Sequence, residues 1–307
     1  MKLSIVATLY QSARYLPEFH ARCSQAAQSL VGDDYEIVLV NDGSPDNSLE
    51  TAIGLTERDN HVVVIDLSRN FGHHKAMMTG LSHATGERVF LIDSDLEEPP
   101  ECLLHFAEEM NDGHNDVVYG VQEARKGNWF ERFSGSVFWK LINSLSGLSL
   151  PANIVTARLM SRRYVDALLR HKESEIFIAG LWQITGFAQK AVTIRKLSIS
   201  PSTYTFRRKV SLLVNSVTSF SSAPLVAIFY IGVFIFLGAC CYTGWLLIHW
   251  MFLSSALAGW TSVMASIWLL GGLMISFIGI IGIYLSKVFS ESKQRPYTII
   301  RNLHGRD

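Results

Sequence analysis

Charged side chains are missing from a long stretch of this chain. Between Val210 and Ser286 there is no Asp, Glu, Lys or Arg, although the 307 residues include 27 acidic and 27 basic ones. Folded soluble domains carry charge throughout their surface, so a block of this length is not typical of one. The formal net charge is zero, which gives no basis for a nucleic-acid partner, and we expect none. The sequence divides into a charged part, an uncharged block and a short basic tail at 287–307.

Cysteine is also scarce, and the chain offers no cysteine framework. The four residues Cys23, Cys102, Cys240 and Cys241 do not have the spacing of a metal site. We therefore expect reduced, structural thiols in a cytosolic and membrane context. The apolar run Leu3–Leu9 is too short for a secretory signal, and we expect no signal peptide.

The uncharged block contains two apolar stretches, at about 224–250 and 262–285. Each exceeds the roughly 20 residues that a helix needs to cross a hydrocarbon core of about 30 Å. A short connection separates them, so residues 223–286 are predicted to form a two-helix transmembrane hairpin. Three tryptophans gather near that connection, as in an interfacial aromatic belt: Trp245, Trp250 and Trp260.

Basic residues predict the orientation of this hairpin. Arg207, Arg208 and Lys209 precede the first span and the basic tail follows the second, whereas the connection has none. The positive-inside rule then predicts a multi-pass protein with its large N-terminal part and both termini in the cytoplasm. Residues 206–222 have apolar side chains at helical spacing, which favours an amphipathic interfacial helix over a linker helix packed on the domain.

Small residues recur on the second span and permit close helix packing. They are Gly272, Ser276, Gly279 and Gly282. This packing would lie either within the hairpin or between subunits of a homo-oligomer, and both interpretations stay open at this point.

The first 120 residues alternate short apolar runs with helical patterns. Strands are predicted at 3–9, 35–40, 61–67, 88–92 and 116–120, and helices at 15–30, 47–58, 73–84 and 99–110. This alternation predicts an α/β fold with a mostly parallel, doubly wound sheet. Further helices at 129–146 and 161–172 and a strand at 191–199 are assigned to an acceptor-facing part of the same domain.

Three polar clusters follow strand ends in this pattern: Asp42 with its turn, Arg69-Asn70, and Asp93-Ser94-Asp95. Ligands of parallel sheets bind beyond the carboxyl ends of the strands, so these clusters predict one site. Asp93 and Asp95 point to the same side of the chain and Ser94 to the other. Two carboxylates so placed suit Mg²⁺ or Mn²⁺ bound with phosphate oxygens.

Two of these clusters have alternative interpretations. Asp42 could accept a hydrogen bond from a nucleobase, with Gly43 allowing close approach of the backbone, or it could simply cap a turn. Arg69 and Asn70 could hold a phosphate or a ribose, or belong to a solvated loop. His73 could lie near phosphate or at a solvated helix end, and it is left out of the predicted catalytic set.

These motifs carry a resemblance. In their order and spacing, the segments 40–44, 69–72 and 93–100 resemble family 2 glycosyltransferases of the GT-A fold. The polyisoprenyl-phosphate branch looks most similar, with dolichol-phosphate mannose synthase and bactoprenol glucosyl transferases as members. The hairpin and Arg295-Pro296-Tyr297 also look like that branch. The resemblance implies a GT-A domain over residues 1–205 at a bacterial-type inner membrane. It also implies an inverting, Mg²⁺- or Mn²⁺-assisted sugar transfer from a nucleotide-diphosphate donor, such as a UDP-sugar, to a polyprenyl phosphate.

The resemblance also implies roles for individual residues. Thr8, Tyr10 and Ser12 would line the base pocket, and Asp42 would contact the base. Asp93 and Asp95 would hold metal and diphosphate, with Ser94 in the nucleotide-sugar site. Arg125 would lie near phosphate, and Arg158 matches an arginine of a Phe-Arg-Leu motif. From these roles and the basic segment before the first span, we expect the lipid phosphate to be held by Arg125, Arg158, Arg207, Arg208 and Lys209.

One departure from the family pattern bears on the acceptor. The branch usually has an aspartate five residues before the Phe-Arg-Leu arginine, and Asn153 stands there. Asn153 cannot act as the general base that a hydroxyl acceptor needs. A phosphate monoester, whose second pKa is about 6, is already ionised near neutral pH. Asn153 therefore favours a lipid-phosphate acceptor.

Other interpretations remain beside this one. A saccharide or glycolipid hydroxyl could be the acceptor, or Asn153 could mark a catalytically inactive nucleotide-sugar-binding subunit. A flippase is disfavoured, because two spans without an intramembrane charge make a poor solute pathway.

Overall fold

The computed structural model describes residues 1–122, 153–173, 177–195, 218, 221–253 and 259–305. Its centre is an eight-stranded sheet with the order β7-β5-β6-β4-β1-β2-β3-β8. The strands are β1 Leu3–Leu9, β2 Tyr35–Asn41, β3 Val62–Leu67, β4 Arg88–Leu91, β5 Val117–Gln122, β6 Ile154–Ser161, β7 Gln189–Ile194 and β8 Ile300–His304. The neighbours β4-β1-β2-β3 are all parallel. The predicted mostly parallel α/β fold is confirmed.

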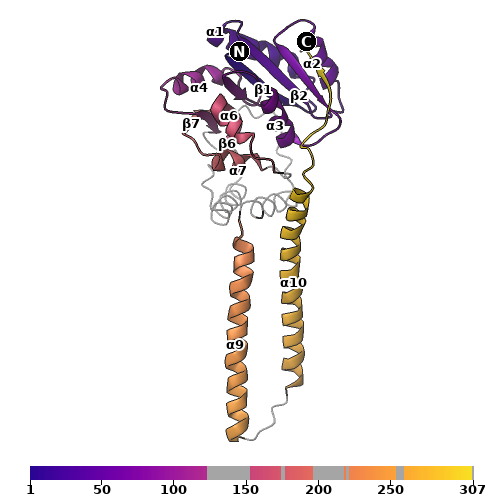
Figure 1. Ribbon diagram of the computed structural model, residues 1–307, viewed down its shortest axis with the longest axis vertical. Helices are drawn as coiled ribbons and strands as arrows, with labels where there is room; N and C mark the ends of the chain where they lie inside the picture. Colours follow the sequence, from indigo (N-terminus) through magenta and orange to yellow (C-terminus); the bar gives the residue numbers. More distant parts are fainter. Residues whose placement is uncertain (123–152, 174–176, 196–217, 219–220, 254–258, 306–307) are drawn as a thin grey trace.

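Helices cover both faces of this sheet (Figure 1). On one face lie α1 Leu16–Val31, α2 Ser48–Thr56 and α4 Cys102–Met110. On the other lie α3 His73–His83, α6 Arg162–Leu168 and α7 Ile178–Ile184. Strands β1, β2 and β3 are buried along their whole length and mostly apolar, because both of their faces are covered. Each face has its own cluster of buried side chains, one around Phe90 and Phe106 and the other around Met77 and Tyr164.

Two strands were not predicted from the sequence. Strand β6 runs antiparallel to both β4 and β5, and its apolar pattern is interrupted by Thr156 and Arg158. Strand β8 lies in the basic tail and pairs antiparallel with the edge strand β3. Neither has the uniform apolar run of a central strand, and both pair with distant segments. The predicted helix at 129–146 lies outside the described residues.

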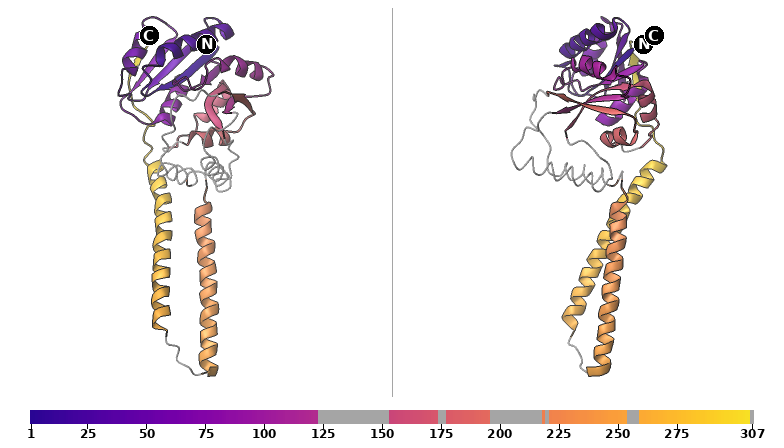
Figure 2. Two further views of the ribbon diagram at one scale, coloured as in Figure 1. Left: turned by 180° about the vertical axis from the view of Figure 1, so that it is seen from behind. Right: turned by 90° about the vertical axis from the view of Figure 1, so that its left-hand side faces the viewer.

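Two long helices, α9 Ala223–Leu253 and α10 Trp260–Ser292, run away from the sheet domain (Figures 1 and 2). Among the described residues, one segment is long and apolar enough to cross a membrane: Leu270–Ser292, with 23 residues, none of them buried. Ala223–Ile235 is a shorter apolar stretch. The hydroxyl of Tyr284 in α10 donates to the carbonyl oxygen of Ser221, just before α9, at 2.6 Å. Most of the predicted interfacial helix at 206–222 lies outside the described residues.

Candidate active site

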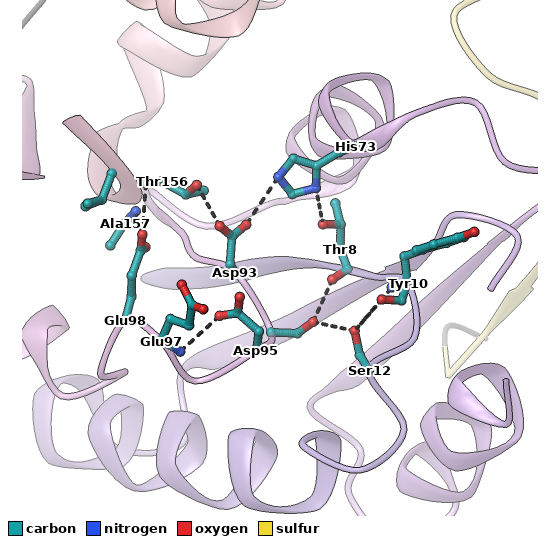
Figure 3. Close-up of polar contacts among 12 residues, drawn as sticks. Thr8, Tyr10, Ser12, His73, Asp93, Asp95, Glu97, Glu98, Thr156 and Ala157 are labelled. Atoms are coloured by element: carbon teal, nitrogen blue, oxygen red, sulfur yellow. Dashed lines mark hydrogen bonds and ion pairs between the residues drawn. The ribbon is translucent and has the colours of Figure 1, made fainter. Parts of the chain in front are cut away.

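The carboxyl ends of β4, β1 and β2 lie side by side at one edge of the sheet. The acidic segment after β4, the turn after β2 and the segment after β1 therefore meet there, as predicted. The loop after β3 and the start of α3 complete the same edge. Figure 3 shows the side chains that converge on it.

Asp93 is held from two sides. The hydroxyl of Thr156 on β6 donates to its Oδ2 atom at 2.8 Å, and Nε2 of His73 lies 3.3 Å from its Oδ1 atom. The other ring nitrogen of His73, Nδ1, lies 2.9 Å from Oγ1 of Thr8 on β1. A chain of polar contacts thus joins β6, the end of β4, α3 and β1 across the site (Figure 3).

His73 stands among carboxylates. Burial opposes its protonation, but the hydrogen bond and charge of Asp93, with the charges of Asp42 and Asp95, raise the pKa of His73. His73 is not among the catalytic residues predicted from the sequence. The sequence feature that could have identified it is its position as the first residue of a helix after a polar strand end. Many solvent-exposed residues share that feature.

The side chains of Ser94 and Asp95 point in different directions. Oδ1 of Asp95 accepts from the backbone N–H of Glu97 at 3.0 Å. Ser94 is buried, and its hydroxyl donates to the Thr8 carbonyl at 2.8 Å and lies 2.9 Å from the Ser12 hydroxyl. Ser94 therefore links the acidic segment to the end of β1 and the residues after it, and its side chain points into the protein and not toward solvent.

Asp42 links two of the predicted clusters. It is 2% exposed, and its carboxylate accepts from the backbone N–H groups of Phe71 at 2.7 Å and Gly72 at 3.0 Å. Burial raises the pKa of Asp42, against the effect of these hydrogen bonds. Gly43 has φ of 59°, and a Cβ atom there would lie 2.4 Å from the backbone nitrogen of Asn70. Turn 41–44 and loop 68–72 are therefore interlocked.

The remaining predicted nucleotide residues differ in exposure. Thr8 and Ser12 are buried, whereas Tyr10 is 51% exposed. Arg69 and Asn70 are both exposed. The Arg69 guanidinium lies 4.1 Å from the centre of the Phe71 ring, and its Nη1 donates to the Asn70 carbonyl at 3.0 Å. These exposed side chains present an aromatic ring, a cation and an amide at the site.

Arg158 lies deeper than predicted. It is 0% exposed, on β6, and stacks on the ring of Trp182. Its Nε donates to the Thr156 carbonyl at 3.2 Å and its Nη2 to the Val155 carbonyl at 3.3 Å. In the described part of the chain, Nη1 has no hydrogen-bond partner. Burial lowers the pKa of Arg158 to about 9, which leaves it cationic at neutral pH.

Glu98 is a further functional candidate, within the segment 93–100, for which the sequence predicts no role. It is 1% exposed, and its carboxylate accepts from the backbone N–H groups of Thr156 at 3.2 Å and Ala157 at 2.7 Å (Figure 3). Glu98 therefore fixes β6 against the turn that carries Asp93 and Asp95. Asn153 stands just before β6, where its carbonyl accepts from the Gln122 N–H at 2.9 Å.

Arg125, Arg207, Arg208 and Lys209 lie outside the described residues. Within the described ranges, no group of three or more His, Cys, Asp or Glu side chains could hold a metal ion by itself. Mg²⁺, however, is usually bound through one or two carboxylates together with substrate phosphates and water. Asp93 and Asp95 could supply these two carboxylates, since both follow the end of the same strand.

Comparison with known proteins identifies the family. The sequence model of glycosyl transferase family 2 matches residues 4–169. The chain belongs to this family, and the resemblance stated from its motifs is confirmed. It is therefore a glycosyltransferase.

Relatives match nearly the whole chain. A Mycobacterium tuberculosis protein named as a glycosyltransferase is 51% identical over 100% of this chain and 90% of its own length. The bactoprenol glucosyl transferase of Shigella phage SfV is 31% identical, covering 98% of this chain and 99% of that one. The prophage bactoprenol glucosyl transferase homolog of Escherichia coli is 30% identical, with 99% of each covered.

Solved structures are more distant. The S. aureus TarS structure in complex with UDP-GlcNAc is 20% identical over 70% of this chain and 66% of that one, with a TM-score of 0.44.

Proposed function

We propose that this glycosyltransferase moves a sugar from a UDP-sugar to a polyprenyl phosphate, such as undecaprenyl phosphate, at a membrane. The observation that carries the proposal is the pair Asp93 and Asp95 at the end of β4, beside the interlocked turn of Asp42. The 30–31% identity over nearly full length to proteins named bactoprenol glucosyl transferases supports the acceptor. The product would serve cell-surface glycan synthesis or modification.

The donor would lie along the carboxyl ends of β4, β1 and β2. The Asp42 turn and the exposed ring of Tyr10 would face the base, and Arg69 and Asn70 would face ribose or phosphate. Asp93 and Asp95 would hold Mg²⁺ or Mn²⁺, which neutralises the charge that builds on the departing diphosphate. Thr156 and His73 keep the Asp93 carboxylate in place for that role.

The acceptor chemistry needs no protein base. An oxygen of the lipid phosphate, already ionised near neutral pH, attacks the anomeric carbon from the side opposite the diphosphate. The new carbon–oxygen bond forms as the bond to UDP breaks, which inverts the anomeric configuration. Asn153, which has no basic side chain, is compatible with this step and would be a poor substitute in transfer to a hydroxyl.

Cations would receive the acceptor phosphate. We assign Arg125, Arg207, Arg208 and Lys209 to direct contact with it. Arg158 is fully buried, so we assign it an indirect role. Its positive charge lies beneath the site. Its Nε donates to the backbone carbonyl of Thr156, and the side-chain hydroxyl of Thr156 donates to Asp93.

The connectivity of the chain supports a transmembrane hairpin. The sheet domain precedes α9, and β8, after α10, belongs to the same sheet. A chain that leaves one domain and returns to it must cross a membrane an even number of times. If α10 spans, α9 must also span, which supports a multi-pass protein. The predicted orientation places the catalytic domain and both termini in the cytoplasm of a bacterial-type cell.

Lipid-product analysis tests the proposal. Membranes containing the protein, incubated with labelled UDP-sugar, Mg²⁺ and undecaprenyl phosphate, should yield an acid-labile labelled lipid. Membranes carrying Asp93→Asn should not. Label that appears only on saccharide or glycolipid hydroxyls would favour the alternative acceptor, and donor binding without any transfer would favour an inactive subunit.

A further inference from the structure

The segment after α10 is docked on the sheet domain at three places. The Tyr297 hydroxyl donates to the carbonyl of His171, next to the end of α6. The hydroxyls of Thr298 and Thr79 lie 2.7 Å apart, which joins the segment to α3. Residues 300–304 then form β8 at the sheet edge. The basic tail predicted from the sequence thus contributes a strand to the catalytic domain.

Arg301 on β8 reaches a buried carboxylate. Its Nη1 atom lies 3.4 Å from Oδ2 of Asp66, which is 2% exposed. Its Nη2 atom donates to the carbonyl of Ser68 at 2.6 Å. The other carboxylate oxygen of Asp66 accepts from Nδ2 of Asn41 at 2.8 Å. One guanidinium therefore binds the end of β3, and through Asp66 it reaches the end of β2.

Both partners lead into the candidate donor site. Asn41 is followed by Asp42, and Oδ1 of Asn41 accepts from the Ser44 N–H at 3.3 Å within the same turn. Ser68 begins loop 68–72, whose Phe71 and Gly72 N–H groups bind the Asp42 carboxylate. Turn 41–44 and loop 68–72 are thus joined twice. Asp42 binds the backbone of the loop directly, and Arg301 links the ends of the strands from which the turn and the loop start.

We infer that Arg301 is a positioning residue of the donor site, acting from the C-terminal strand through Asp66 and Ser68 on the two nucleotide-facing turns. The inference rests on the proposed function, because it takes that edge of the sheet as the nucleotide site. A guanidinium fork donates to a carboxylate and a carbonyl at fixed angles, which an ammonium group does not do. The membrane helix α10 is consequently tied to the donor site by eight residues of intervening chain and one side chain.

The test compares full-length variants in nanodiscs. For Arg301→Gln we expect UDP to bind about threefold to tenfold more weakly, as for loss of one or two charge-assisted hydrogen bonds. The KM for the donor should rise, while kcat and the KM for the lipid acceptor change little. Arg301→Lys should recover part of the loss. Arg295→Gln removes a positive charge from an exposed position of the same segment and should behave as wild type.

A second measurement does not depend on the donor. Hydrogen exchange of the amides in 41–44 and 68–72 should quicken in Arg301→Gln, while the amides of β1 and α1 keep their protection. Unchanged exchange and unchanged UDP affinity would overturn the inference, and so would a uniform loss of protection, which marks a role in overall stability alone. Wild-type protein that binds no UDP or UDP-sugar would refute the proposed donor instead, whatever the exchange data show.

Discussion

At the scale of single residues, the role proposed for Asp93 depends on how its carboxylate is held. Thr156 and His73 contact its two oxygens from opposite sides of the site, and Thr8 in turn contacts His73. A carboxylate fixed in this way would hold a metal ion without reorganising, and the metal would stabilise the negative charge that develops on the leaving diphosphate.

Asp93→Asn should lower kcat by at least about a hundredfold, because the metal that would neutralise the leaving diphosphate loses a charged ligand. The amide keeps nearly the same shape and an oxygen for the Thr156 hydroxyl, so the melting temperature should change little. Turnover with labelled donor and thermal unfolding measure the two effects. Near-normal turnover in this variant would disprove the assigned role.

His73→Ala should lower kcat/KM about tenfold, because Asp93 loses one of its two supports and Thr8 loses its partner. His73→Gln, which can still bridge the two, should lose less. Steady-state kinetics with varied donor would show the effect. His83→Gln, at the other end of α3, serves as the control, and an equal loss there would attribute the effect to the helix as a whole.

At the scale of elements, the turn between β2 and α2 is stabilised by one carboxylate. Asp46 accepts hydrogen bonds from the hydroxyls of Ser44 and Ser48 and from the backbone N–H groups of Ser48 and Ala13. The Ser48 N–H is one of the unpaired donors at the start of α2, so Asp46 also stabilises that helix end. Burial opposes ionisation, but these hydrogen bonds lower the pKa of Asp46 from 3.8 to about 2.

This shift predicts a pH dependence with a definite sign. A carboxyl whose pKa is lower in the folded state stabilises the fold above its unfolded pKa, and that stability is lost as pH falls through the folded pKa. The stability difference between wild type and Asp46→Asn should therefore be largest near neutral pH and shrink between about pH 4 and pH 2. Thermal unfolding across this range checks it, and a constant difference would contradict it.

At the scale of the whole molecule, the chain leaves the sheet domain through the two long helices and returns to it as strand β8. Because β8 follows α10 and pairs with β3, the C-terminus is bound to the domain that begins the chain (Figure 1). This connection supports the proposed topology, with both ends of the chain on one side of the membrane, independently of the distribution of basic residues.

Reporter fusions would test that topology. A fluorescent protein that folds only in the cytoplasm should fluoresce when fused after residue 307. Alkaline phosphatase, active only outside the cytoplasm, should be active when inserted between α9 and α10. Activity of the phosphatase at residue 307 would contradict the proposed orientation, and its inactivity at both positions would contradict the hairpin.

Much of the fold was predictable from the sequence because local pattern encodes it. Buried parallel strands need continuous apolar runs, and β1, β2, β3 and β4 were each located to within about a residue or two. Strands β6 and β8 were missed because they carry charged residues that pack against distant parts of the chain: Arg158 lies on the Trp182 ring, and Arg301 pairs with Asp66. A pattern within one segment carries no trace of such partners.

The sequence by itself determined the family, the mostly parallel sheet and the acidic edge where its polar clusters meet, because strand ends and motif order are local properties of the chain. Only the tertiary structure decided what each side chain does there. It turned Ser94 inward, locked Asp42 onto Phe71 and Gly72, brought His73 to Asp93 and carried Arg301 back across the molecule to Asp66. These contacts join residues from 20 to more than 200 positions apart in the chain, and only packing of the whole domain brings them together.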